Sequence, residues 1–259
     1  MTPLPILLYH SVDDEPRADF ARWSVSVKQF EEHMAVVRRG GWTTVTMSTL
    51  VRLLGAGEEL PERLIAVTFD DGFEDVLTRA VPVMDEMVGT AYVTSGYLRD
   101  VPDPQLDRPG RMLASSQLAA IADAGWEVGV HGHRHVALDA VGRLTAARDI
   151  TESKHRVEDA LGAPTTSFAY PYGYHDKYVQ SLVRDAGFAH AVAVKNLYSH
   201  ALDDPWGIAR ITIERGMDAD WLDRRLHETS PRTAPPRERL ITTGWRAARR
   251  VRTALQGVG

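Results

Sequence analysis

Cysteine is absent from this sequence, which excludes disulfide bonds, thiolate metal ligands and a cysteine nucleophile. Any bound metal ion must therefore be held by histidine or carboxylate side chains. Long hydrophobic runs are absent as well: the apolar stretch near the start covers only Ile6–Tyr9, too short for a signal peptide or a membrane span. We therefore expect a cytoplasmic protein, unless a leader has been trimmed. A net charge of −5 gives no reason to expect nucleic acid as a partner.

Short apolar runs alternate with longer amphipathic segments along the 259 residues. The runs that we expect to be strands are Ile6–Tyr9, Leu64–Phe69, Ala91–Thr94, Glu127–Val130, Ser167–Tyr170, Ala191–Val194 and Ala209–Ile213. The segments with helical period include Val27–Arg39, Ser115–Ala124, Leu144–Leu161 and Asp176–Ala186. This pattern predicts an α/β protein with a mostly parallel sheet. Seven strands can close into a barrel or remain an open sheet, but no glycine-rich phosphate loop follows any run, which disfavours a nucleotide-binding open sheet.

Side chains capable of chemistry gather at the ends of these predicted strands. They are His10, Asp70, Asp71, His131, His133, His135 and Tyr172, with Arg210 inside the last strand. Active sites of parallel α/β barrels form at the carboxyl ends of the strands, where the loops converge on one mouth. The placement therefore predicts an enzyme.

The first group is Thr68-Phe69-Asp70-Asp71-Gly72. Adjacent carboxylates at a strand end point in different directions, so one can bind a metal ion while the other faces a substrate. Gly72 permits a sharp turn after them. A plain surface turn is the alternative, because Asp-Asp-Gly is common turn chemistry. The position directly after an apolar run favours the functional interpretation.

The second group is His131-Gly132-His133-Arg134-His135. Two histidines four residues apart share a face if the segment turns helically, and with one aspartate they form a three-ligand site typical of catalytic zinc. A histidine-rich surface loop or an adventitious metal site is the alternative. Spacing alone leaves open which two of the three histidines bind.

The third group runs from Phe168 to Gly173, where Pro171 and Gly173 bracket Tyr172. Such a stiff turn can present a backbone N–H that stabilises an oxyanion, although for this motif taken alone an aromatic packing turn is the more ordinary interpretation.

Together these groups resemble the motifs of the polysaccharide deacetylases, the NodB-like carbohydrate esterase family 4. The resemblance covers roughly residues 4–215, and the first two motifs are highly specific. It implies a distorted (β/α)7 TIM-like barrel that removes acetyl groups from an N-acetylated sugar, glycoside or oligosaccharide. It also implies a divalent metal, most often Zn²⁺, with Co²⁺, Ni²⁺ or Mn²⁺ as alternatives. On this resemblance Asp71, His131 and His135 are metal ligands, Asp70 is the general base, and Tyr172 supplies the oxyanion N–H.

Two positions depart from the family motifs. Gly132 replaces the usual Ser or Thr, which predicts that one hydrogen bond behind the ligands is missing. Ala169 stands where an arginine normally holds the catalytic base. We expect Arg210, from the last strand, to reach Asp70 instead; a salt bridge at the rim is the alternative.

The family's usual C-terminal motif, an apolar strand ending in the histidine acid, is not found near the end of the chain. Ile6–Tyr9 followed by His10 has that character. The first and last strands of a closed barrel are neighbours, so a strand moved between chain ends keeps its place in space. The chain therefore resembles the permuted branch that includes poly-N-acetylglucosamine deacetylases, with His10 as the general acid. His200 is the reserve candidate, and a hydrogen-bonded core histidine is the alternative for His10.

Aromatic residues are candidates for a sugar-stacking rim, although each can simply be part of the packing. They are Trp23, Tyr97, Tyr172, Tyr174, Tyr198 and Trp206, of which Tyr172, Tyr174 and Trp206 are our predicted substrate-binding residues.

We divide the chain into a barrel over residues 1–230 and an arginine-rich tail over residues 231–259. Within the tail, Leu240–Leu255 is compatible with a basic amphipathic helix on an anionic membrane or a partner protein, or with packing back on the barrel. Two other function classes are a cyclic imide or ureide amidohydrolase of the same superfamily and a non-catalytic carbohydrate-binding protein. Retention of Asp70, Asp71, His131 and His135 argues against both.

Overall fold

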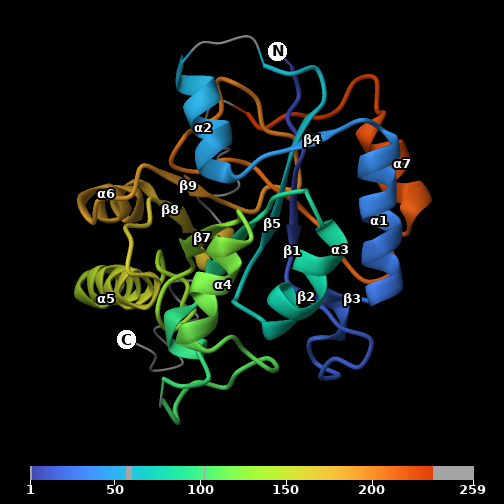
Figure 1. Ribbon diagram of the computed structural model, residues 1–259. Helices are drawn as coiled ribbons and strands as arrows, with labels where there is room; N and C mark the ends of the chain where they lie inside the picture. The colour runs from blue at the N-terminus through green and yellow to red at the C-terminus, as the bar shows by residue number, and fades with distance from the viewer. Residues whose placement is uncertain (1, 57–59, 102, 236–259) are drawn as a thin grey trace.

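Eight parallel strands form a curved sheet in the computed structural model, which describes residues 2–56, 60–101 and 103–235 (Figure 1). Seven of them follow one another around the sheet, and in spatial order they are β10 (Ile211–Thr212), β1 (Ile6–Tyr9), β5 (Leu64–Phe69), β6 (Thr90–Val93), β7 (Glu127–Val130), β8 (Ser167–Ala169) and β9 (His190–Val192). The eighth, β4 (Thr43–Thr44), pairs only with β5. An isolated parallel bridge links Val192 of the edge strand β9 to Ile208, which shortly precedes the other edge strand, β10. The predicted distorted barrel is therefore confirmed. Strand β1 lies between β10 and β5.

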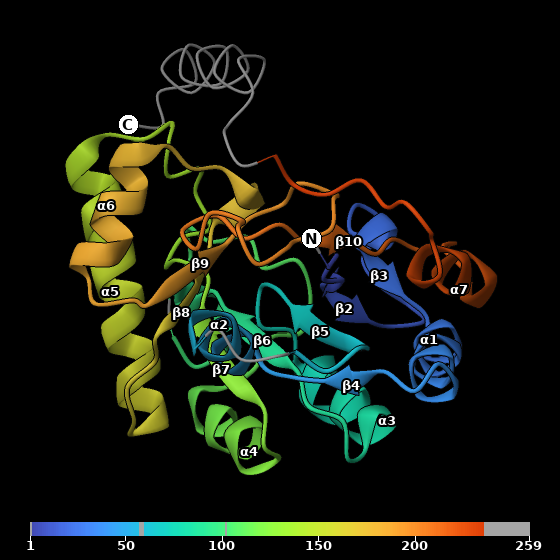
Figure 2. The same cartoon turned by 90° about the horizontal axis from the view of Figure 1, so that it is seen from above.

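Helices surround the strands when the molecule is viewed from above (Figure 2). They are α1 (Val27–Arg39), α3 (Val81–Met84), α4 (Leu118–Asp123), α5 (Arg143–Leu161), α6 (Lys177–Asp185) and α7 (Ala219–Leu226). A further helix, α2 (Met47–Ala56), covers the amino-terminal end of the barrel, where Met47 and Leu50 join the interior core. The described helices include none long and apolar enough to cross a membrane.

Short elements complete the fold. Three strands of two residues each were not predicted, because such segments are too brief to show a period: β2 (Ser11–Val12), β3 (Ser24–Val25) and β4 (Thr43–Thr44). The single-turn segments are η1 (Ala21–Trp23), η2 (Val76–Ala80), η3 (Ser95–Tyr97), η4 (Ser115–Gln117) and η5 (Pro171–Gly173).

Alternation along the strands decides which residues face the barrel interior. Ile6, Ala66, Tyr92, Ala169 and Val192 share one core with α2, whereas their sequence neighbours pack against the outer helices. Continuing this alternation beyond the strand ends brings His10, Asp70 and His131 to the inward face at the carboxyl rim. The sheet therefore positions the polar residues that the sequence singled out.

The predicted domain boundary lies just before the last described residues. Tyr198 exchanges backbone hydrogen bonds with Arg232 and Ala234, so the chain at least to residue 234 packs on the barrel. The predicted helix over Leu240–Leu255 lies outside the described residues.

Candidate active site

Asp71, His131 and His135 are the only group of metal-ligating side chains that converge within the described parts of the chain. One potential ligand atom from each lies within 4.8 Å of the other two. The Nε2 atoms of His131 and His135 are 3.6 Å and 3.1 Å from Oδ1 of Asp71. This oxygen is buried and receives no well-aligned hydrogen bond. A buried carboxylate oxygen facing two imidazoles fits a divalent cation of the zinc type.

His131 has a fixed orientation. Its Nδ1 lies 2.8 Å from the carbonyl oxygen of Ala169, which makes Nδ1 the protonated nitrogen and leaves the Nε2 lone pair facing the aspartates. Burial lowers the pKa of His131 to about 4, so the ring is neutral at pH 7 and able to act as a ligand.

The histidine segment is an irregular loop and not the helical turn that its spacing suggested. Gly132 and His135 both adopt positive φ, 74° and 52°, which turns the chain back on itself. His133 is directed away from the cluster: its Nδ1 lies 2.8 Å from the Ser95 hydroxyl, and its Nε2 is 3.5 Å from Glu152. Of the three histidines, the pair assigned by resemblance is the one that lies with Asp71.

Asp149, on α5, holds this loop from behind and was missed by the sequence analysis. Its two carboxylate oxygens accept hydrogen bonds from the backbone N–H groups of His133 and Arg134, at 2.8 and 2.9 Å. A Cβ on Gly132 would lie only 2.7 Å from Asp149 Oδ1, so the departure from the family motif makes room for this carboxylate. The available signal was a polar residue among the buried positions of an amphipathic helix, which include Ala146, Ile150 and Val157.

Asp70 and Arg210 form a buried, two-pronged ion pair. Arg210 Nη1 and Nη2 donate to Oδ1 and Oδ2 of Asp70 at 2.7 and 2.8 Å, and Arg210 is 0 % exposed. Arg210 therefore makes the contact expected from the sequence. Its guanidinium lies over the Tyr92 ring and also donates to the Thr68 hydroxyl. Burial raises the pKa of Asp70, but the charge and hydrogen bonds of Arg210, together with the nearby His131 and His10, hold the pKa below its ordinary value.

His10 lies close enough to both aspartates for their charges to act on its ring. Its Nδ1 is buried and has no hydrogen-bond partner, and its ring contacts Phe20 and Trp23 at centroid distances of 5.8 and 5.6 Å. Burial lowers the pKa of His10, and the negative charges of Asp71 and Asp70 offset this only in part. If His10 were simply a core histidine, its buried ring nitrogen would be hydrogen bonded, and Nδ1 is not.

Aromatic rings stand around the histidine ligands. The Tyr172 ring is 4.5 Å from His135 and stacks on Tyr174 at 5.8 Å, and Tyr97 stacks on the same histidine. Tyr172 and Tyr174 are 53 % and 38 % exposed, so both can meet a ligand. Tyr172 also has a positive φ of 60°, as part of the turn that ends at Gly173.

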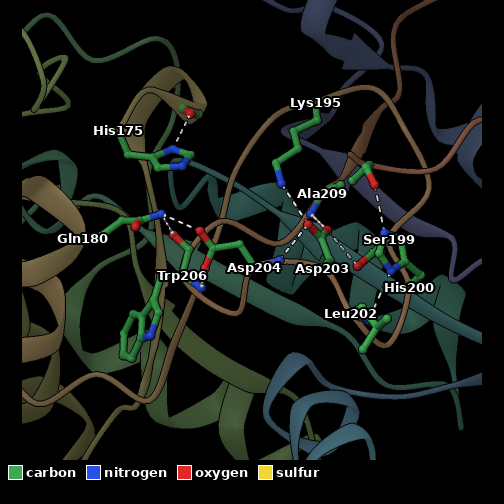
Figure 3. A network of polar contacts seen from close by, with 12 residues as sticks. His175, Gln180, Lys195, Ser199, His200, Leu202, Asp203, Asp204, Trp206 and Ala209 are labelled. Carbon is green, nitrogen blue, oxygen red and sulfur yellow. Dashed lines mark hydrogen bonds and ion pairs between the residues drawn. The ribbon is translucent and has the colours of Figure 1, made fainter. Parts of the chain in front are cut away.

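Three other candidates have their described contacts elsewhere. Trp206 lies beneath Arg184 of α6, and its carbonyl oxygen accepts from Gln180 and Tyr170. Tyr198 is buried under Arg225. His200 sits next to Ser199, which pairs with Leu4 before β1, and therefore lies at the amino-terminal end of the barrel. Both His200 ring nitrogens are hydrogen bonded, to Ala234 and Leu202 (Figure 3). This explains why His200 is not part of the cluster.

Comparison with known protein families gives the class of the protein. A family model described as polysaccharide deacetylase matches residues 57–191, just over half of the chain. The chain therefore belongs to the polysaccharide deacetylase family, as its motifs indicated. Membership supports a hydrolase acting on carbon–nitrogen bonds.

Two curated relatives illustrate the range of the family. One is "Putative polysaccharide deacetylase YxkH" of Bacillus subtilis (strain 168), 22 % identical over 83 % of this chain and 72 % of its own length. The other is the poly-β-1,6-N-acetyl-D-glucosamine N-deacetylase of Escherichia coli (strain K12), 28 % identical over 52 % of this chain. This chain spans only 22 % of that enzyme's length.

Solved structures share the fold. The Streptococcus pyogenes deacetylase PplD in complex with acetate has a TM-score of 0.75 at 19 % identity, covering 85 % of this chain and 96 % of PplD. IcaB from Ammonifex degensii has a TM-score of 0.68 at 22 % identity, covering 86 % of this chain and 98 % of IcaB. At these identities the likeness extends to the barrel architecture and no further.

Proposed function

We propose that the protein is a metal-dependent deacetylase that hydrolyses the acetamide of an N-acetylated sugar to a free amine and acetate. The observation that carries this proposal is the convergence of Asp71, His131 and His135 beside the Asp70–Arg210 pair. A three-ligand site next to an ionised carboxylate can activate water for attack on a carbonyl.

The ligand set is suited to a divalent ion of the zinc type. Two imidazoles and one carboxylate leave coordination positions open, and Oδ1 of Asp71 lacks the hydrogen bond that a buried oxygen normally has. When bound, such an ion lowers the pKa of water and polarises a carbonyl oxygen.

Asp70 acts as the general base in this proposal. Arg210 holds both of its oxygens and keeps it ionised, so the carboxylate can accept a proton from the attacking water. The Tyr172 N–H stabilises the oxyanion that forms. His10 gives a proton to the departing amine in this proposal: its Nδ1 has no hydrogen-bond partner, and the negative charges of Asp71 and Asp70 favour the protonated ring against the effect of burial on its pKa.

An N-acetylated sugar is the substrate class that the aromatic surroundings favour. Tyr172 and Tyr174 offer exposed rings next to His135, and sugar rings stack on such surfaces. The printed name of the Escherichia coli relative specifies β-1,6-linked N-acetylglucosamine. We take that polymer and its fragments as the first substrates to test.

The test is acetate release from a panel of N-acetylated sugars, with zinc or cobalt supplied, for wild type and Asp70→Asn side by side. We expect metal-dependent release that falls by about a thousandfold or more in the variant, because the base is removed. Asp123→Asn, an exposed carboxylate on α4, is the matched control and should keep full activity. Release that persists in Asp70→Asn, or no release from any panel member by metal-loaded protein, would contradict the proposal.

A further inference from the structure

Four residues inside the barrel form one row across the strands β6 to β9. They are Tyr92, Gly129, Ser167 and His190, which the parallel register of the strands places at one level. The three side chains of the row are almost completely buried, with at most 1 % of their surface exposed. The row therefore belongs to the barrel interior, and the proposed chemistry uses none of its members.

Gly129 allows the Tyr92 ring to cross the strand β7. A Cβ on Gly129 would lie 2.5 and 2.6 Å from two carbon atoms of the Tyr92 ring, closer than such atoms can approach. Because this side chain is absent, the Tyr92 hydroxyl reaches Ser167 of β8, at 2.7 Å. The Ser167 hydroxyl is in turn 2.8 Å from Nε2 of His190. The glycine backbone and a buried polar chain thus fix the position of the ring.

Arg210 places its guanidinium over this ring. Four hydrogen bonds lie along the edge of the guanidinium: two to Asp70, one to the Thr68 hydroxyl and one to the carbonyl oxygen of Ala193. Because all N–H groups of a guanidinium lie in its plane, such bonds fix its position in that plane and leave its faces without support. Arg210 Cζ is 5.4 Å from the centroid of the Tyr92 ring, within the range of a cation–π contact. The ring therefore supplies the contact that hydrogen bonds cannot provide.

The tilt of the Arg210 guanidinium matters because its two bonds to Asp70 set the direction of the carboxylate. A guanidinium that tilts on its flexible stem turns the carboxylate with it, and a general base must lie within hydrogen-bond reach of the attacking water. Among the described members of the interior core that contains Ile6 and Ala66, Tyr92 is the only aromatic residue. No other member of that core can replace its ring beneath the cation.

We propose that Tyr92 is a positioning residue for this reaction: its ring supports the face of the Arg210 guanidinium, and Arg210 then fixes the Asp70 carboxylate. Gly129 and Ser167 act one step further back, since they fix the ring that supports Arg210. The inference rests on the proposed function and extends it into the barrel interior, because residues that touch neither substrate nor metal then determine how the base is oriented.

The first test compares phenylalanine with leucine at position 92, because phenylalanine keeps the ring face and leucine removes it. Urea denaturation gives the unfolding equilibrium constant of Tyr92→Leu relative to Tyr92→Phe, in the full-length protein and in an Asp70→Asn/Arg210→Met background. We expect this ratio to be at least about tenfold larger with Arg210 present, because the void left in the core is the same in both backgrounds and only the cation differs. Should Tyr92→Leu fail to fold by circular dichroism, Tyr92→Met replaces it in both backgrounds.

The second test measures turnover of the N-acetylated sugar that releases acetate. Tyr92→Leu should lose about tenfold in kcat and keep KM within about twofold, because the base is misdirected while the contacts with the substrate remain. Tyr92→Phe should keep kcat within about threefold of wild type. Tyr198→Leu is the matched control and should also keep kcat. Tyr198 is likewise buried, lies under Arg225 of α7 and donates its hydroxyl to the Arg225 carbonyl oxygen, next to Ser199 at the amino-terminal end of the barrel.

The outcomes separate this proposal from the proposed function. A stability ratio that is larger with Arg210 present, together with a loss of kcat that phenylalanine rescues, supports the positioning role. Equal ratios in the two backgrounds overturn it, whether or not the protein releases acetate. Full kcat in Tyr92→Leu, or an equal loss in Tyr198→Leu, also overturns it and leaves the deacetylase proposal standing. If wild type releases no acetate from any sugar, the proposed function fails, and the stability ratio alone decides whether Tyr92 holds the Arg210–Asp70 pair.

Discussion

Two buried polar clusters lie at opposite ends of the barrel and differ in how their hydrogen bonds are satisfied. At the carboxyl rim, Asp71 Oδ1 and His10 Nδ1 are buried without a well-aligned hydrogen bond. At the amino-terminal end, Asp203 accepts from Lys195, Ser199 and the backbone N–H of Ala209, at 2.9, 3.0 and 2.8 Å (Figure 3). His200, in the same loop, has both ring nitrogens paired.

The difference distinguishes a structural cluster from a candidate site. Unsatisfied buried polar atoms cost free energy, so a fold retains them where another ligand uses them. The Asp203 cluster leaves no such atoms and fixes a loop of irregular backbone. Polar residue types alone do not separate the two regions, since both contain histidine and aspartate.

Arg210 connects the two regions. Asp203 holds the backbone N–H of Ala209, and the next residue sends its guanidinium through the barrel interior to Asp70. Ala169 and Tyr92 belong to the same interior core, and the Arg210 guanidinium lies over the Tyr92 ring. The Asp203 cluster at the amino-terminal end thus fixes the backbone next to Arg210, and Arg210 binds Asp70 at the carboxyl rim.

The largest effect that tests this comparison is expected for Arg210→Met. Removing the cation leaves Asp70 buried and unpaired, which should cost about 3–5 kcal/mol of stability. Turnover should fall about a hundredfold, because the base loses its orientation. Urea denaturation and acetate release measure the two effects. Adding Asp70→Asn to Arg210→Met should restore much of the stability, because the stranded charge is then gone. Unchanged turnover in Arg210→Met would refute the role of this pair.

Asp203→Asn should lower the stability of the protein but leave its turnover nearly unchanged. The amide cannot accept all of the bonds that the carboxylate receives and leaves Lys195 without its partner, so we expect a loss of about 2–3 kcal/mol. The kcat of the folded protein should stay within about threefold of wild type, because no group of the site is removed. Unfolding midpoints and kcat at a temperature where both proteins are folded provide the comparison. A loss of turnover with unchanged stability would mean that the Asp203 cluster takes part in function and is not purely structural.

Asp149→Asn tests the support behind the metal ligands. The amide presents an N–H to one of the two backbone N–H groups that now donate to the carboxylate, so the loop carrying His131 and His135 should loosen. We expect zinc affinity to fall about tenfold and kcat at saturating zinc to recover. Competition with a chelating dye measures the affinity. Glu152→Gln is the control, since Glu152 lies on the same helix but pairs with Arg156 and, in the histidine loop, approaches the His133 side chain and not the backbone. Equal affinities in the two variants would remove Asp149 from the site.

Much of the cluster at the carboxyl rim could be predicted from the sequence, because strand alternation determines which of its residues face the barrel interior. Ile6–Tyr9, Leu64–Phe69 and Glu127–Val130 have the bounds that their apolar runs indicate. The two-residue period then carries His10 and Asp70 to the interior at one rim. Arg210 could be predicted because the third motif lacks its arginine and Asp70 still needs a cation.

The rest depends on contacts between distant segments. The positive φ of His135 and the direction of His133 follow from Asp149, sixteen residues from His133, and from Ser95 on the neighbouring strand's loop. His200 looked like a candidate acid because its pairing with Ala234 has no local signal. Trp206 was predicted at the rim for the same reason: its contact with α6 cannot be read from a linear pattern.

Asp75 offers the smallest and sharpest test, because it combines features of both clusters. One oxygen accepts from Ser11, as in the satisfied cluster, whereas the other has no well-aligned partner, as at the rim. Burial raises the pKa of Asp75 from 3.8 to about 6, although Ser11 and the Val12 backbone oppose the shift. The folded protein therefore holds this proton more tightly than the unfolded chain does.

The sign of the pH effect follows from that difference. A raised carboxyl pKa costs no stability below 3.8, and the cost grows as the pH rises and is complete above about 6. Asp75→Asn, which stays neutral, should therefore match wild type at pH 3.5 and exceed it by about 1–2 kcal/mol at pH 8, less than the full shift because the site is partly open to water. Urea titrations across this range measure the difference, with Asp123→Asn as control. A difference that is constant with pH would mean that water or a backbone group already satisfies Asp75.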